Sequence, residues 1–115
     1  MINFACKTFN LDEVIRCSLN LTKTEFNIIK YLIENGNKEF TTKKISKIFK
    51  IGLSTTQKAI KKINDKELIK QSQKNLEKGG YIFYYSIKNT SILKRQILEI
   101  LHNWMNKVEK DLKKW

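Results

Sequence analysis

Two short amphipathic segments joined by a tight turn constrain the fold of this chain more than any other feature. The second segment, STTQKAIKKIND, follows the turn IGLS, and at about 100° per residue its positions suited to a core gather on one arc. Those positions are Thr56, Ala59, Ile60 and Ile63. The opposite arc carries Ser54, Gln57, Lys58, Lys61 and Asp65, with Thr55 and Lys62 at its edges. The segment therefore predicts a helix with one face in the core and the other in solvent or against a partner.

Capping residues predict where these two helices start and stop. Ser54, followed three residues later by Gln57, forms a possible capping box, so we expect the second helix to start at Ser54. The preceding stretch, TTKKISKIFKIG, predicts a short helix that Gly52 ends, with Leu53 inserting into the core. The apolar residues of this short helix are Ile45, Ile48 and Phe49. Two helices joined by a glycine turn, the second basic on its outer side, form the helix-turn-helix arrangement.

The segment after the second helix predicts a β-hairpin. LIKQSQK and YIFYYSI are strand-like, and the loop NLEKGG between them has paired glycines that suit a hairpin. Alternation along a half-buried strand predicts Phe83, Tyr85 and Ile87 as core residues. Helix, turn, helix and then hairpin is the order of a winged helix, which places Lys74 and Lys78 at or near the tip of the wing.

Two more helices are expected before this region. Asn10 with Glu13 caps the short helix LDEVIRCSL, and Thr22 with Glu25 caps FNIIKYLIEN, which Gly36 stops. The apolar residues of the latter at helical spacing are Phe26, Ile29, Leu32 and Ile33. The fold class predicted from the whole pattern is mainly α with a small β-hairpin wing, an α+β winged helix-turn-helix.

From about Thr90 to Trp115 the chain predicts one long amphipathic helix. At about 1.5 Å per residue this helix spans nearly 40 Å, which is longer than a compact winged-helix body can cover. Its apolar stripe comprises Leu93, Ile97, Leu101, Trp104, Val108, Leu112 and Trp115, widened by Ile100 and Met105. We therefore expect a homodimer formed through Ile97, Leu101, Trp104, Val108, Leu112 and Trp115.

The charge of the chain is large and uneven. Its 115 residues, enough for one domain, include 23 basic and 11 acidic ones, a net charge of +12. Residues 40–80 hold eleven lysines against Asp65, Glu67 and Glu77, so about a third of the chain carries two thirds of the excess charge. Such a patch favours a polyanion, either nucleic acid or an anionic membrane surface.

Several function classes find little support in the sequence. No apolar run approaches the roughly 18 residues of a membrane span, and MINFACKTF lacks a signal-peptide pattern, so a soluble, cytoplasmic protein without a membrane partner is expected. GGYIFYY lacks the lysine and hydroxyl of a phosphate loop, and nothing orients Cys6 or Cys17 toward His102. We therefore expect no enzyme, no cofactor and no complete metal site within one chain, and a structural role for His102.

The two cysteines leave three alternatives open. Cys6 and Cys17 are eleven residues apart and form no CxxC pair. Buried free thiols are the default expectation for such residues. A disulfide or redox switch, or a metal site shared across a dimer, remains an alternative.

Taken together, LTKTEFNIIKYLIENG and FTTKKISKIFKIGLSTTQKAIKKINDKELI resemble the MarR-type and TrmB-type winged-helix transcription regulators, especially the archaeal ones. The resemblance covers residues 20–88 and implies a DNA-binding domain there, with an N-terminal segment and short helix at 1–19 and a dimerisation helix at 89–115. Two features depart from the family: Glu67 replaces the glycine often found before the first wing strand, and NLEKGG replaces the aspartate-arginine wing pattern.

In that family the second helix of the motif enters the major groove, which assigns base or phosphate contacts to Ser54, Thr55, Gln57, Lys58, Lys61 and Lys62. Lysine ammonium groups and helix-start hydroxyls suit phosphate, whereas glutamine can bond adenine in a bidentate way. Further phosphate contacts are expected at Thr42, Lys43, Lys44, Lys74 and Lys78. The function expected is that of a homodimeric, sequence-specific regulator of transcription that binds double-stranded DNA.

Two other functions stay open. The aromatic strand YIFYYSI with nearby lysines suits RNA or single-stranded nucleic acid, although Gly80 occupies a position where the aromatic RNA-recognition strand needs a ring. The other alternative is an adaptor whose winged helix contacts a protein instead of DNA.

Overall fold

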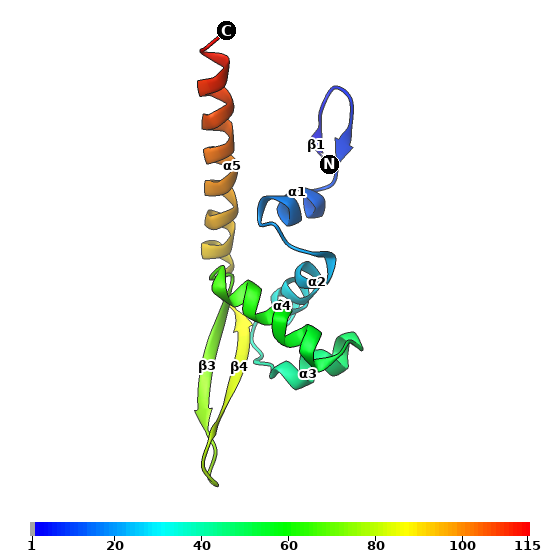
Figure 1. The fold of residues 1–115 in the computed structure, drawn as a ribbon, viewed down its shortest axis with the longest axis vertical. Helices are drawn as coiled ribbons and strands as arrows, with labels where there is room; N and C mark the ends of the chain where they lie inside the picture. Colours follow the sequence, from blue (N-terminus) through cyan, green and yellow to red (C-terminus); the bar gives the residue numbers. More distant parts are fainter. Residues whose placement is uncertain (1) are drawn as a thin grey trace. The chain divides into compact units, whose positions relative to one another are not determined.

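The computed structural model describes residues 2–115, which form five helices and two β-hairpins (Figure 1). In order along the chain these are β1 (Ile2–Asn3), β2 (Thr8–Phe9), α1 (Leu11–Ser18), α2 (Lys23–Glu34), α3 (Thr42–Phe49), α4 (Leu53–Asp65), β3 (Ile69–Asn75), β4 (Tyr81–Ile87) and α5 (Thr90–Leu112). They belong to two compact units, one comprising Thr24–Thr90 and the other the chain up to Lys23 together with Ser91–Trp115. The predicted winged helix-turn-helix with a long C-terminal helix is confirmed.

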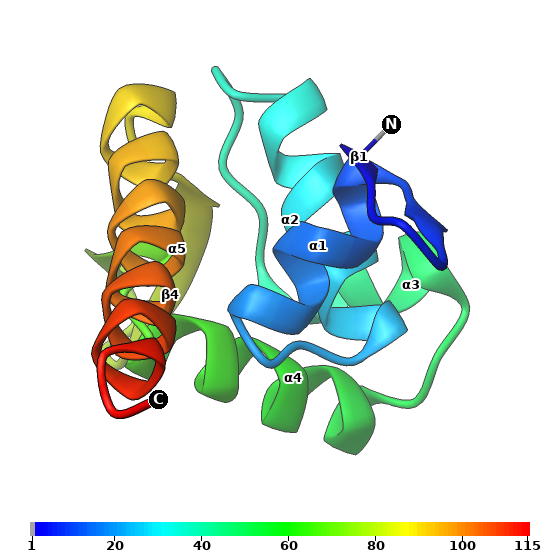
Figure 2. The ribbon, with the colours of Figure 1, turned by 90° about the horizontal axis from the view of Figure 1, so that it is seen from above.

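The core of the Thr24–Thr90 unit follows the predicted arc of α4. Thr56, Ala59, Ile60 and Ile63 are all buried, and α3, which joins α4 through a short turn, packs against it (Figure 2). The other buried hydrophobic residues of this unit are Phe26, Ile28, Ile29, Leu32, Phe40, Ile45, Leu68 and Ile69. The buried face of α4 thus fixes which of its residues point outward.

The prediction that Ile33 belongs to the buried face of α2 is wrong. Ile33 is 40% exposed, whereas Ile28, which the pattern left out, is fully buried. Ile33 lies in the last turn of α2, and although its direction falls between those of Phe26 and Ile29, the core does not cover it there.

The start of α4 also differs from the expectation. The N-cap is Gly52 in an extended conformation, with no side-chain capping bond, and the helix begins at Leu53. Ser54 therefore lies inside the first turn and cannot form the predicted box with Gln57. The Gly52 carbonyl accepts both the backbone N–H of Thr56 at 3.0 Å and its hydroxyl at 2.9 Å. Leu53, expected in the core, is 46% exposed at the first position of α4, ahead of the buried Thr56.

Three helices end at a left-handed residue that is not glycine. Asn20 follows α1, Lys50 follows α3 and Glu67 follows α4, with φ of 53°, 53° and 59°. After α4, the Leu68 N–H donates to the Ile63 carbonyl at 3.1 Å and the Glu67 N–H to the Asn64 carbonyl at 2.9 Å. This is the Schellman arrangement, in which glycine is the usual left-handed residue. Lys50, and not Gly52 as predicted, therefore closes α3.

The wing is an antiparallel pair of β3 and β4, in register from Ile69↔Ile87 to Asn75↔Tyr81. Phe40 adds a bridge on the other edge of β4 through two 2.8 Å backbone hydrogen bonds with Tyr85. Phe83, Tyr85 and Ile87 are half-buried, not in the core. Toward its tip the hairpin extends beyond the helices of its unit (Figure 1).

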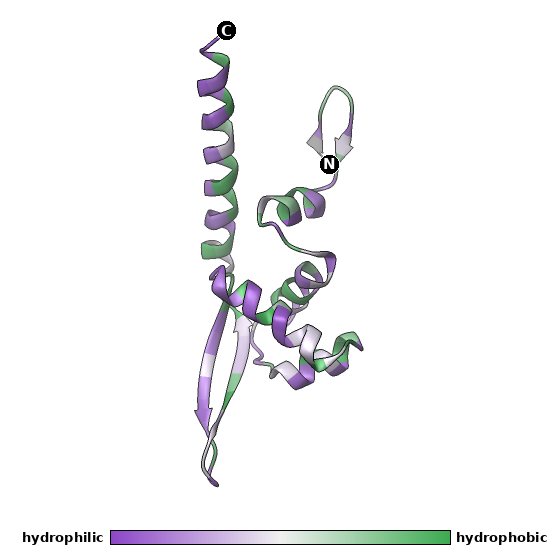
Figure 3. Cartoon of the chain, viewed as in Figure 1, coloured by the Kyte–Doolittle hydropathy of each residue, from purple (hydrophilic) through white to green (hydrophobic). Residues whose placement is uncertain are grey.

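The other unit contains a small hairpin that the sequence did not predict. β1 pairs with β2, and the rings of Phe4 and Phe9 meet edge to face with centroids 5.4 Å apart. The predicted cap of α1 is confirmed, since the Glu13 N–H donates to Asn10 Oδ1 at 2.7 Å. Hydrophobic and hydrophilic residues lie on different sides of α5 (Figure 3). Within the described part of the chain, no helix is both long and apolar enough to cross a membrane.

Candidate nucleic-acid interface

The outer face of α4 is the centre of the candidate interface. Its polar residues are exposed because the opposite face of the helix is committed to the core. The exposed polar residues of this predicted face are Ser54, Thr55, Gln57, Lys58, Lys61 and the acidic Asp65. Hydroxyl, amide and ammonium groups therefore lie together on one side of a thirteen-residue helix.

The N-terminus of α4 is open to a ligand. Gly52 offers no side-chain cap, and the amide of Thr56 is the first that bonds back into the helix start. The amides of Leu53, Ser54 and Thr55 precede that first bond, so they lie at the positive end of the helix. Such amides, next to two exposed hydroxyls, suit a phosphate group.

The start of α3 is engaged within the fold instead. Thr41 Oγ1 accepts the Lys44 N–H at 3.1 Å, which caps the helix. The side chain of Thr42 hydrogen-bonds with Tyr85. Burial raises the pKa of Tyr85 above the usual value for tyrosine, and this hydrogen bond offsets part of the rise. Thr42, a predicted DNA contact, therefore ties α3 to the wing.

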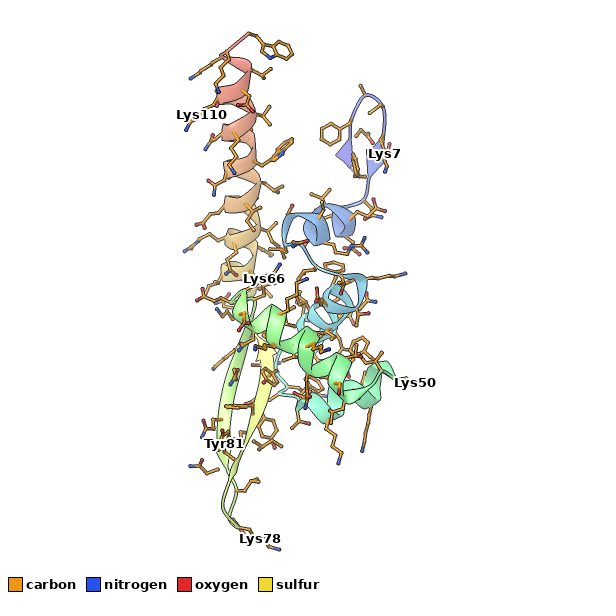
Figure 4. The ribbon with its side chains drawn as sticks, in the orientation of Figure 1. Lys7, Lys50, Lys66, Lys78, Tyr81 and Lys110 are labelled. Atoms are coloured by element: carbon orange, nitrogen blue, oxygen red, sulfur yellow. The ribbon has the colours of Figure 1, made fainter. Side chains whose placement is uncertain are left out.

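The lysines of α3 extend the basic surface. Lys43, Lys44 and Lys47 are exposed, and Lys44 Nζ lies 5.4 Å from the centroid of the Phe40 ring. Lys50, just after the helix, is also exposed (Figure 4). A flexible ammonium group at each of these positions can reach a phosphate without a fixed geometry.

Lys62 takes a different role from its neighbour Lys61. Its Nζ lies 3.1 Å from Oε1 of Glu25, a carboxylate whose residue is only 6% exposed. Because a buried carboxylate needs a partner for its charge, this ion pair joins α4 to α2. The sequence placed Lys62 at the edge of the outer arc, but the pairing depends on how α2 lies against α4.

The two predicted lysines of the wing are both exposed, but only one of them lies at its tip. Lys78 lies at the tip, in the loop that connects β3 to β4 (Figure 4). Lys74 lies back along β3, where its Nζ is 3.8 Å from Oε2 of Glu39 and 4.4 Å from the centroid of the Tyr84 ring. Gly79 and Gly80 at the tip have φ of 90° and 82°, which explains why glycines occupy this loop.

Nine of the eleven predicted DNA contacts are thus exposed, and the two half-buried ones, Thr42 and Lys62, have internal partners. All eleven belong to the Thr24–Thr90 unit. Sequence reasoning missed two exposed apolar residues of the wing, Leu76 and Tyr81, which are 51% and 58% exposed. The signal available was their position, Leu76 within the loop that contains the paired glycines and Tyr81 directly after it.

The predicted dimerisation residues lie on α5 or at its end, and most of them are exposed. Trp104, Val108, Leu112 and Trp115 are exposed, whereas Ile97 and Leu101 are half-buried. Leu93, the first residue of the stripe, is buried. The apolar stripe is therefore covered at its beginning and open toward the C-terminus.

The cysteines differ from their default expectation. Both Cys6 and Cys17 are exposed free thiols. Cys6 lies in the loop between β1 and β2, and Cys17 lies on an exposed side of α1, so neither position is covered.

Comparison with known proteins supports a winged-helix regulator fold. Residues 8–108 match the model of the DnaD N-terminal domain. A possible transcriptional regulator from Methanosarcina mazei is 37% identical over the whole chain and 96% of its own length, with a TM-score of 0.93.

Two bacterial structures share the fold at lower similarity. A mutant of MepR from S. aureus, bound to an oligodeoxyribonucleotide, is 14% identical over 90% of the chain and 71% of its own, with a TM-score of 0.57. ZitR of Lactococcus lactis, a zinc-responsive MarR family member, is 26% identical over 83% and 63%, with a TM-score of 0.51. The fold is therefore that of MarR-family and archaeal transcriptional regulators.

Proposed function

The chain belongs to the DnaD N-terminal domain family, and we propose that it is a transcription regulator that binds specific sites in double-stranded DNA as a homodimer. The observation that carries this proposal is the outer face of α4, where polar and basic side chains surround an uncapped helix start. The possible regulator from Methanosarcina mazei and the DNA-bound MepR mutant support the same function. The proposal assigns the protein no catalytic reaction or cofactor and places it in the cytoplasm.

In this proposal α4 enters the major groove and divides its contacts by chemistry. Gln57 bonds adenine, Lys58 or Lys61 reaches guanine, and the methyl group of Thr55 contacts thymine. Phosphate contacts come from the open helix start and from Ser54, Lys43, Lys44, Lys74 and Lys78. Thr42 and Lys62 instead hold the domain together, through Tyr85 and Glu25.

The homodimer rests on the open part of the α5 stripe. Trp104 is 58% exposed and Trp115 is 98% exposed. A soluble monomer rarely leaves such a continuous apolar surface in contact with water. A two-fold dimer through residues 89–115 presents two copies of the 20–88 DNA-binding domain. Their α4 helices then enter successive major grooves, about 10 base pairs apart, on an inverted repeat.

The salt dependence of duplex binding tests the proposed interface. Each phosphate neutralised by a lysine contributes a slope of about 0.9 to the fall of log affinity with log salt concentration, so the four lysines assigned to phosphate in each of two protomers predict a slope of about 7. A nearly flat response would exclude the DNA interface and favour an adaptor. Competition by single-stranded nucleic acid at equal strength would instead favour an RNA or single-strand binder. Selection of bound fragments from random duplex DNA then identifies the operator.

A matched pair of lysine variants locates the interface. Lys61→Ala, on the outer face of α4, should weaken duplex binding several-fold without changing stability. Lys110→Ala removes an exposed lysine from α5 and should leave both quantities unchanged. Equal loss of binding in the two variants would show that only the net charge matters.

A further inference from the structure

The outer half of the wing carries aromatic side chains that the fold does not cover. Tyr81 is 58% exposed, and its ring meets that of Phe83 with centroids 5.2 Å apart. Further along β4 the next aromatic residue on the same face, Tyr85, is held by Thr42 and by the backbone of Phe40. On this face of β4, the aromatic side chain near the helices is therefore held by neighbouring residues, whereas the one nearest the tip is exposed to solvent.

Amide side chains accompany these rings on the same face. The strand register places Asn75 opposite Tyr81 and Gln73 opposite Phe83, and residues directly opposite in an antiparallel pair share a face. Asn75 and Gln73 are both exposed. The distal wing therefore presents two neighbouring rings beside two groups that can each donate and accept hydrogen bonds.

A positive charge lies at the end of this face. Lys78 is at the tip of the wing (Figure 4), whereas Lys70 and Lys74, opposite Ser86 and Ile82, lie on the other face of the hairpin. An apolar protein partner would gain contact with the rings but would leave amides and ammonium groups facing apolar surface. An unpaired nucleotide satisfies all three, because its base stacks on a ring, its edge bonds an amide and its phosphate attracts a lysine.

We propose that this face of the wing, formed by Gln73, Asn75, Tyr81 and Phe83, is a stacking site for unpaired bases of DNA. The protein then binds a duplex with a single-stranded extension more tightly than the same duplex with blunt ends. This site goes beyond recognition of intact duplex by α4, and it gives the unusual NLEKGG wing a function of its own.

Fluorescence anisotropy with two probes tests the site. The probes are one blunt duplex and the same duplex carrying a single-stranded extension of about ten nucleotides. The full-length protein should bind the extended probe at least about fivefold more tightly, the low end of what one stacked base contributes. Tyr81→Ala should abolish that difference while blunt-duplex affinity stays the same, and Tyr81→Phe should retain it.

A control variant and an optical signal complete the test. Phe4→Ala removes an aromatic ring of similar exposure, 55%, from the other structural unit and should leave the preference intact. A 2-aminopurine base in the extension should lose fluorescence on binding the full-length protein and Tyr81→Phe, but not Tyr81→Ala. Equal affinity of the full-length protein for both probes would overturn the stacking site while leaving duplex recognition standing. Equal weakening of both probes by Tyr81→Ala would show instead that the wing contacts intact duplex.

Discussion

The two structural units differ sharply in how they treat apolar residues. Of the fourteen buried hydrophobic residues in the described chain, eleven lie in Thr24–Thr90 and three, Leu19, Leu21 and Leu93, lie in the other unit. Large exposed hydrophobic residues show the reverse distribution, with four in the first unit and ten in the second. The winged helix therefore carries its own core, whereas the unit containing α5 has apolar surface that a second copy can bury.

The largest effect that would break this comparison comes from removing the end of α5. A chain that stops after Ile100 loses Trp104, Val108, Leu112 and Trp115, so it should be monomeric or aggregate. Because two linked half-site contacts gain about 10²- to 10⁴-fold over one, tight duplex binding should fall by that order. Light scattering and anisotropy measure the two effects. A full-length protein that is monomeric at micromolar concentration, yet binds a single half-site tightly, would contradict the dimer.

The core of the winged helix should respond to a single buried side chain. Ile63→Ala opens a cavity at a fully buried position of α4 and should lower the free energy of unfolding by about 2–5 kcal/mol. Ile33→Ala removes the same atoms at a 40% exposed position and should cost less than about 1 kcal/mol. Urea unfolding of both variants provides the comparison. Similar losses of stability in the two variants would mean that Ile33 is as buried as Ile63, which contradicts the packing of α2 in the structure.

The periodicity of α4 predicted its buried and exposed faces correctly, because a helix repeats its direction regardless of its neighbours. The N-cap of α4 was harder to predict. Gly52 adopts the extended conformation of an N-cap without a side-chain hydrogen bond, so the helix begins at Leu53 and not at Ser54. The ion pair of Lys62 with Glu25 could not be predicted, because it depends on the packing of α2 against α4. Local periodicity thus reveals faces, while partners across the core require the fold.

That ion pair leads to a smaller expected effect within the winged helix. Lys62→Ala removes a partner of the buried Glu25 carboxylate and should lower stability by about 1–2 kcal/mol, a modest cost because Lys62 is 39% exposed. The neighbouring Lys61→Ala should leave stability unchanged and weaken DNA binding. Urea unfolding and anisotropy on the same proteins separate the two roles. A loss of DNA affinity in Lys62→Ala with no loss of stability would return Lys62 to the interface.

The smallest effect concerns the left-handed residue after α4, at the junction of helix and wing. Glu67 has a φ of 59°, and a side chain in that region costs about 1–2 kcal/mol that glycine avoids. Glycine also loses about 0.5–1 kcal/mol through its greater freedom when unfolded, so Glu67→Gly should raise the free energy of unfolding by up to about 1 kcal/mol. Glu67→Ala removes the same charge but keeps the strained backbone, so it should give no such gain, and urea unfolding distinguishes the variants. If Glu67→Gly were less stable than Glu67→Ala, the side chain of Glu67 would not be the source of strain at this turn, and the Schellman geometry assigned here would be wrong.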